Sequence, residues 1–114
     1  MIVNNDEIVG TGYNGAPRGA LNCCDVNMCK RQELNIPPGE RYELCESVHA
    51  EQNAIISAGR SKCKDSKIYI YGWDVALEKP IQGNPCMMCN RIIKNANIDS
   101  IVTEDDGKIC RKRI

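Results

Sequence analysis

The sequence has no long hydrophobic run, no recognisable leader and no excess of either charge. No apolar stretch approaches the ~20 residues that cross a bilayer, which argues against a membrane span. No charged-then-apolar segment opens the chain, so we predict a soluble, cytoplasmic protein. The 15 basic and 15 acidic residues balance, whereas proteins that grip large nucleic acids usually carry a basic excess. We therefore expect neither a large nucleic acid nor a membrane as partner.

The chain also lacks internal repeats and low-complexity segments. Its 114 residues suit one domain, and 42% apolar content is enough to fill a single core. We predict one domain over residues 1–114. Met1 already falls inside the first expected strand, so we expect that the sequence is N-terminally incomplete and lacks a helix that precedes this strand.

Helix-like and strand-like segments alternate along the chain and predict an α/β sheet covered by helices. Strands are expected at 1–3 and 7–10 around the turn formers Asn4-Asn5-Asp6, and a Gly- and Pro-rich loop follows at 11–19. Residues 72–84 form a connection in which a hairpin is one option, and Arg111-Lys112-Arg113 resembles a solvated tail. The other expected elements are helices at 49–59 and 86–95 and strands at 67–71 and 98–103.

Eight cysteines are many for a chain of this length. A secreted disulfide scaffold would explain them, but the absence of a leader and the regular helix and strand pattern argue against it. In an intracellular protein such cysteines are more often metal ligands or reactive groups.

The only histidine, His49, stands two residues before Glu51, and Pro85-Cys86-Met87-Met88-Cys89 follows further along the chain. His-x-Glu followed by Pro-Cys-x-x-Cys is the signature of zinc-dependent nucleobase deaminases. Two cysteines one helical turn apart can face the same ion, and the helix N-terminus favours their thiolate forms. We predict that His49, Cys86 and Cys89 bind one catalytic zinc.

Three protein ligands leave the fourth zinc position for water, as a catalytic site requires. Zinc lowers the pKa of bound water from 15.7 to roughly 7, which makes hydroxide available at neutral pH. We predict that this hydroxide attacks the ring carbon that bears the amine. Glu51 would be the catalytic proton shuttle from the water to the ring nitrogen and to the departing ammonia.

Each part of this pattern has a simpler explanation when taken alone. A lone histidine is more often a core or surface residue, and Cys-x-x-Cys could be a redox pair or half of a zinc knuckle. Glu51 could be a favourable charge in a helix's first turn. The combination makes coincidence improbable. A non-catalytic zinc module and thiol–disulfide exchange nevertheless remain the competing hypotheses from other functional classes.

A second group of cysteines lies in the irregular region before the first long helix. We predict that Cys23, Cys29 and Cys45 bind a structural zinc, with Cys24 or a residue from a missing N-terminal segment as the fourth ligand. Partly buried free thiols are the alternative. Cys63 and Cys110 have no partner pattern and are expected to be free thiols.

Five segments, GTGYNGAPRG, NCCD, PGERYELC, SVHAEQNAI and PCMMC, occur in the order seen in deoxycytidylate (dCMP) deaminases, which the chain resembles over nearly its whole length. These enzymes belong to the cytidine deaminase-like superfamily. The resemblance implies a three-layer α/β/α fold with a central mixed sheet. It also implies deamination of dCMP to dUMP, with zinc-bound hydroxide attacking C4.

The resemblance further implies that Asn14 contacts the deoxyribose hydroxyl, and Arg18 is a candidate phosphate ligand, with Arg31 and Arg41 weaker ones. Relatives that form hexamers regulated by dCTP and dTTP suggest a homo-oligomer and a nucleoside triphosphate regulator. The connection at 72–84 is longer than in better-known members and borders the active site. Cytidine, cytosine and guanine therefore stay open as alternative substrates.

Overall fold

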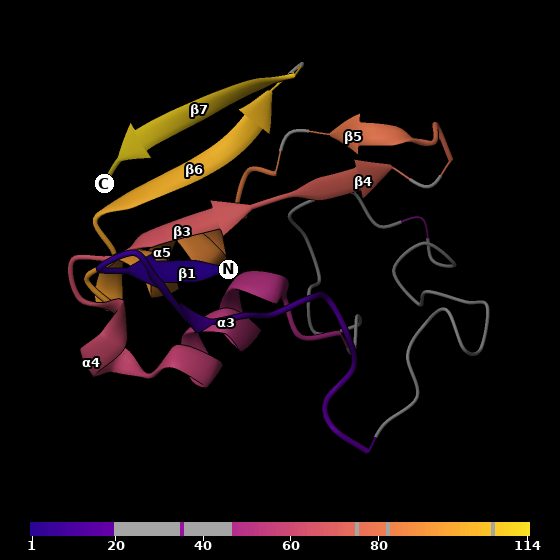
Figure 1. Cartoon of the computed structure of the whole chain (residues 1–114). Coiled ribbons are helices and arrows are strands. Elements are labelled where there is room, and N and C mark those ends of the chain that lie inside the picture. Colours follow the sequence, from indigo (N-terminus) through magenta and orange to yellow (C-terminus); the bar gives the residue numbers. More distant parts are fainter. Residues whose placement is uncertain (20–34, 36–46, 75, 82, 106) are drawn as a thin grey trace.

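The computed structural model describes residues 1–19, 35, 47–74, 76–81, 83–105 and 107–114, which form a mixed β-sheet with helices packed against it (Figure 1). The chain opens with the expected hairpin, in which β1 (Ile2–Asn4) pairs antiparallel with β2 (Glu7–Gly10). Asn5 and Asp6 have positive φ angles of 51° and 60°, which the tight hairpin turn requires.

The main sheet has five strands in the order β2-β1-β3-β6-β7, with β3 at Lys67–Ile70, β6 at Ser100–Asp105 and β7 at Lys108–Arg113. β3 and β6 are parallel, and the other neighbouring strands are antiparallel. A parallel pair needs a long crossover connection, and here that connection carries α5 (Met87–Asn95). The predicted α/β class and mixed sheet are confirmed.

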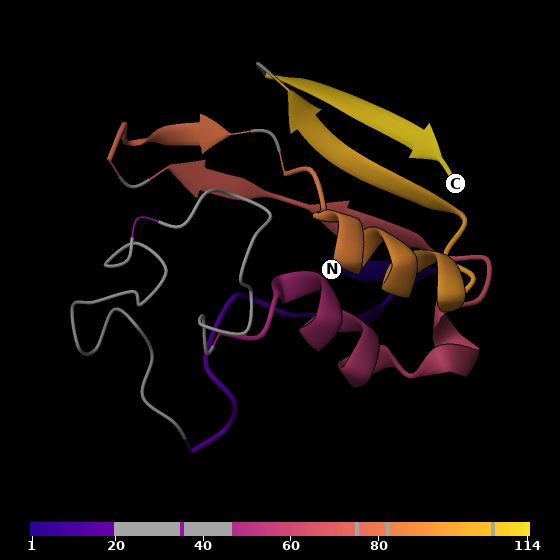
Figure 2. The ribbon, with the colours of Figure 1, turned by 180° about the vertical axis from the view of Figure 1, so that it is seen from behind.

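The described helices all lie on one face of this sheet. α3 (Ala50–Ala58) packs against β1, β2 and α5, and a short helix, α4 (Arg60–Cys63), continues after it. Seen from behind, α3 and α5 lie together in front of the strands (Figure 2). The described residues thus provide the sheet and one helical layer of the three layers implied by the resemblance, and no described helix covers the opposite face.

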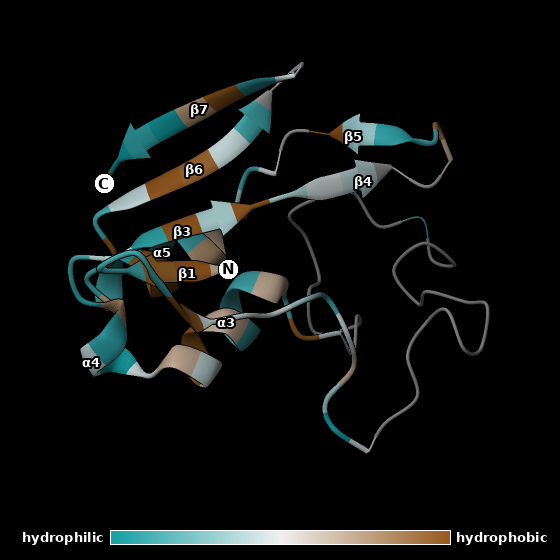
Figure 3. Ribbon diagram, in the orientation of Figure 1, coloured by the Kyte–Doolittle hydropathy of each residue, from teal (hydrophilic) through white to brown (hydrophobic). Residues whose placement is uncertain are grey.

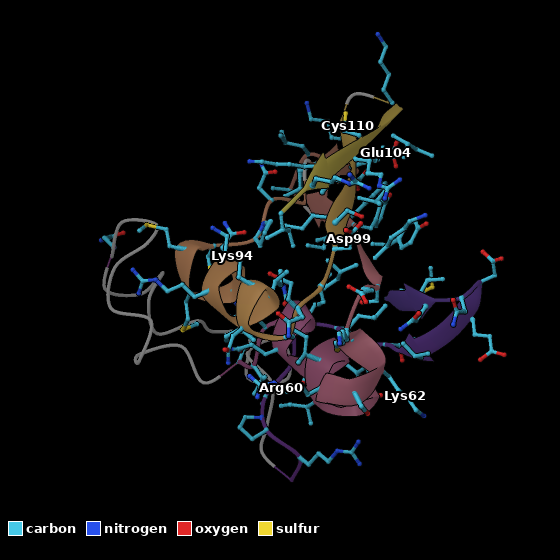
Figure 4. The ribbon with its side chains drawn as sticks, turned by 90° about the vertical axis from the view of Figure 1, so that its left-hand side faces the viewer. Arg60, Lys62, Lys94, Asp99, Glu104 and Cys110 are labelled. Carbon is cyan, nitrogen blue, oxygen red and sulfur yellow. The ribbon has the colours of Figure 1, made fainter. Side chains whose placement is uncertain are left out.

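The core lies between the helices and the central strands. Hydrophobic residues run along β1, β3 and β6 (Figure 3). Ile68 on β3 lies beside Ile101 on β6, and both pack in one buried cluster with Ile2 of β1 and Ile93 of α5. Cys63 is fully buried in the same cluster, whereas Cys110 is exposed near the turn of the β6–β7 hairpin (Figure 4). Both thiols are free, as predicted.

The 72–84 connection contains the hairpin that the sequence offered as an option, formed by β4 (Gly72–Asp74) and β5 (Lys79–Ile81). The structure differs from the expected elements elsewhere. The C-terminal basic run is part of strand β7 and not a free tail. β6 begins two residues later than expected, because Asn97 turns the chain at φ 61° and Ile98 is buried outside the strand. No described helix is long and apolar enough to cross a membrane.

Two glycines let the segment after β2 lie directly on α3. A Cβ atom on Gly12 would lie 2.4 Å from the carbonyl oxygen of Ala50 and 2.5 Å from the amide nitrogen of Ala54. Gly10 is similarly close, since its Cβ would lie 2.6 Å from the carbonyl oxygen of Ala54. These contacts are with helix backbone, so the loop at 11–19 cannot retain its position if either residue gains a side chain.

We expect Gly12→Ala to lower the free energy of unfolding by about 1–3 kcal/mol, the usual cost of overpacking, because the helix backbone must move to admit the methyl group. Thermal unfolding measures the change. Thr11→Ala is the control, since Thr11 is exposed and its truncation adds no atoms. Equal melting temperatures for the two variants would contradict the close packing of loop and helix.

Candidate metal centre

His49 occupies the N-cap position of α3, just before the first helical residue. Its backbone is extended, with φ −70° and ψ 149°. Its N–H donates to the side-chain oxygen of Gln52 at 2.9 Å, and its carbonyl oxygen accepts from the N–H of Asn53 at 3.0 Å. These bonds fix the helix end that carries the imidazole. His49 followed three residues later by glutamine is a capping-box pattern, which the sequence already contains.

Cys86 occupies the corresponding N-cap position of α5, immediately after Pro85. Its Sγ accepts from the N–H of Cys89 at 3.4 Å, and its carbonyl oxygen accepts from the N–H of Asn90 at 2.9 Å. The first turn of α5 therefore places both sulfurs on the side of the helix that faces α3.

The two helix ends bring the three predicted ligands together. Nδ1 of His49 lies 3.2 Å from Sγ of Cys89 and 3.6 Å from Sγ of Cys86, and all three ligand atoms lie within 4.8 Å of one another. Nitrogen and sulfur ligands at about 2.0 and 2.3 Å from one zinc ion, at tetrahedral angles, are roughly 3.5 Å apart. The donor set and its spacing thus fit a single zinc ion.

The environment of Cys89 favours a bound cation. Burial is the largest of the effects that raise the pKa of this thiol, and the negative charge of Glu51 and the neighbouring Cys86 add to it. A positive ion among these groups offsets both effects, because it stabilises the thiolate directly.

Glu51 lies in the first turn of α3, where its carboxylate is close enough to Cys89 to act on the thiol. It also lines a cavity of about 380 Å³ to which α3 and strands of the main sheet contribute. Ala50 and Ala54 contribute the helix side of this cavity, and most of its other lining is apolar. The remaining residues are Met1, Gly12, Ile68, Tyr69, Ile70, Tyr71, Val102, Thr103, Glu104 and Ile109. The carboxylate is therefore available to a small molecule in the cavity.

The two predicted substrate residues lie in different surroundings. Asn14 lies at the metal centre's end of α3, where its Oδ1 accepts from the N–H of Ala50 at 2.7 Å. Arg18 is exposed and lines a separate hollow of about 730 Å³ together with Ile56 and Ser57 of α3. The structure thus brings Asn14, but not Arg18, to the helix end that carries His49. The helix-capping contact of Asn14 is one that sequence reasoning missed.

The second predicted zinc site lies outside the described residues. This applies to its ligands Cys23, Cys29 and Cys45 and to their possible partner Cys24, as well as to the weaker phosphate candidates Arg31 and Arg41. The second zinc stays a prediction from the sequence.

Comparison with known protein families agrees with this geometry. The model of the family described as "Cytidine and deoxycytidylate deaminase zinc-binding region" matches residues 1–104. The chain belongs to this family. The cluster of His49, Cys86 and Cys89 has the donor set and spacing that suit a zinc ion such as the one in that description.

Among individual members of this deaminase family, the chain is 31% identical to a deoxycytidylate deaminase of Schizosaccharomyces pombe, over 90% of this chain and 28% of that protein. It is 29% identical to the deoxycytidylate deaminase of Mycobacterium phage D29, over 90% of this chain and 73% of that protein. The human deoxycytidylate deaminase is 33% identical over 92% of this chain and 51% of its own length. No solved structure shows a significant match.

Proposed function

We propose that this protein hydrolyses dCMP to dUMP and ammonia at the centre formed by His49, Cys86, Cys89 and Glu51. The observation that carries the proposal is the convergence of the three donors on one point with the Glu51 carboxylate beside Cys89. The relatives named deoxycytidylate deaminases support dCMP as the substrate.

In this proposal, His49, Cys86 and Cys89 hold the zinc ion, and Glu51 moves protons. Zinc supplies a Lewis acid that makes water acidic enough to give hydroxide near neutral pH. Glu51 accepts the proton that the attacking water loses and transfers it to the ring nitrogen of the cytosine. The same carboxylate then assists protonation of the departing amine, so that water and dCMP become dUMP and ammonia.

The lining of the cavity supports binding of a flat base next to Glu51. Ile68 and Ile70 of β3 and Ala54 of α3 offer apolar contacts, and Tyr71 is an aromatic neighbour at the end of the strand. Such a lining with a few polar groups is typical of small-molecule sites. A single domain, a homo-oligomeric state and a nucleoside triphosphate regulator remain predictions from the sequence.

The substrate is tested by incubating the purified protein with dCMP, cytidine, cytosine and guanine at equal concentrations and measuring ammonia release. We expect dCMP to have the highest kcat/KM, because the relatives are named for this nucleotide. Turnover of cytidine with inert dCMP would contradict the nucleotide assignment and leave zinc-dependent deamination in place. No turnover of any of these compounds would contradict the activity itself.

A further inference from the structure

The side chain of Asn14 is bonded to the helix end that carries the metal centre. Its Oδ1 accepts from the N–H of Ala50, the first residue of α3, at 2.7 Å. Ala50 stands between His49, a donor of the metal centre, and Glu51, whose carboxylate acts on Cys89 of the same centre. The first N–H groups of a helix have no partner within the helix, so an external acceptor at this position stabilises the helix end.

An N-cap side chain accepts from the second or third N–H of its helix and not from the first, that of Ala50, and the N-cap residue here is His49. Its Nδ1 faces the sulfurs of Cys89 and Cys86 at 3.2 and 3.6 Å. Asn14, from a distant part of the chain, provides an acceptor at the helix end while the ring nitrogen points to the metal centre.

Further hydrogen bonds join the residues beside Asn14 to the same end of α3. Gly15 and Val48 exchange two backbone hydrogen bonds, of 3.2 and 2.6 Å, in an isolated antiparallel bridge. On the other side, Nδ2 of Asn53 donates to the carbonyl oxygen of Tyr13 at 3.0 Å. Asn14 therefore lies between two residues, Tyr13 and Gly15, that are themselves hydrogen-bonded to this end of α3.

We infer that Asn14 is a positioning residue for the metal centre: its side-chain oxygen holds the N-terminus of α3 so that His49 and Glu51 are correctly placed. The inference rests on the metal centre proposed above. It assigns Asn14 a role that does not depend on the substrate, in addition to the sugar contact predicted from the resemblance. It also couples the 12–15 loop to the metal, because displacement of Asn14 releases the residue between His49 and Glu51.

The test compares zinc retention in Asn14→Ala and Asn14→Asp. Alanine removes the acceptor, whereas aspartate keeps an oxygen acceptor and is favoured at a helix N-terminus. Zinc release from the purified, zinc-loaded proteins is followed with an excess of a chromophoric chelator. We expect release from Asn14→Ala to be about tenfold faster, the scale for groups that orient a metal ligand, and release from Asn14→Asp to stay close to wild type.

Asn4→Ala is the matched control. The Nδ2 of Asn4 donates to the carbonyl oxygens of Lys62 and Lys64 at 2.9 and 3.1 Å, so this asparagine also ties a strand segment to helix backbone, far from the metal centre. We expect it to lower the melting temperature without faster zinc release.

Wild-type zinc release in Asn14→Ala, or equally fast release in both Asn14 variants, would overturn the positioning role. If Asn14→Ala does not fold, the result for Asn14→Asp still decides, because fast release from that variant contradicts the inference. Zinc release needs no substrate. Failure to deaminate dCMP would therefore leave this result interpretable and would count only against the proposed function.

Discussion

Glu51→Gln is expected to lower kcat on dCMP by about 10²–10⁴-fold, the range for loss of a positioned general acid–base group. Glutamine has nearly the same size as glutamate but cannot take up or deliver the proton. The Glu51 carboxylate also raises the pKa of Cys89, so its removal makes the thiolate easier to form. Zinc should therefore be retained at least as well as in the wild type.

The measurement combines kcat from ammonia release with zinc content per chain. Glu7→Gln is the matched control, because Glu7 is an exposed carboxylate on β2 and does not line the cavity. We expect this control to keep wild-type values of both quantities. Full turnover in Glu51→Gln would refute the proton-transfer role and would favour a zinc module that does not use this carboxylate.

Cys89→Ala should abolish turnover and remove one zinc per chain. The variant leaves His49 and Cys86 as the only two described donors at a centre where three donor atoms lie within 4.8 Å of one another. Because burial and Glu51 raise the pKa of Cys89 in the absence of a cation, protons compete with zinc for this thiol. In the wild type we therefore expect zinc retention to weaken as the pH falls.

Cys63→Ala separates loss of the metal from loss of a buried sulfur. Both cysteines are 0% exposed, but Cys63 lies in the hydrophobic core and has no place in the metal centre. We expect Cys63→Ala to lose stability and keep its zinc. Mass spectrometry under native conditions gives the zinc count of each variant. Equal zinc counts in the two variants would exclude Cys89 as a ligand.

The metal centre could be predicted because most of its geometry is local. Cys86 and Cys89 are one helical turn apart, and Pro85 is typical of a helix start, so both sulfurs had to face one side. His49 and Glu51 similarly share the first turn of α3. The hydrogen bonds that shape both turns link residues only three or four positions apart, so they follow from the order of the amino acids.

The strands show where such local signals fail. β7 (KICRKR) has mostly charged side chains, which resemble a solvated tail until β6 supplies a partner for its backbone. Arg111 then bonds to Ser100 and forms an ion pair with Asp99 at 3.2 Å. Ile98 has the apolar character of a strand residue but fills the core just before β6 begins.

The sequence by itself determined the α/β class, the two helix starts, and the donor types that suit zinc. The tertiary structure decided that the donors converge, that burial and Glu51 raise the pKa of Cys89, and that Asn14 caps α3. The physical reason is the separation along the chain of the residues that interact. Helix starts and turn spacing depend on neighbours in the chain, whereas burial, electrostatic interaction and the Asn14–Ala50 bond join segments that only folding brings together.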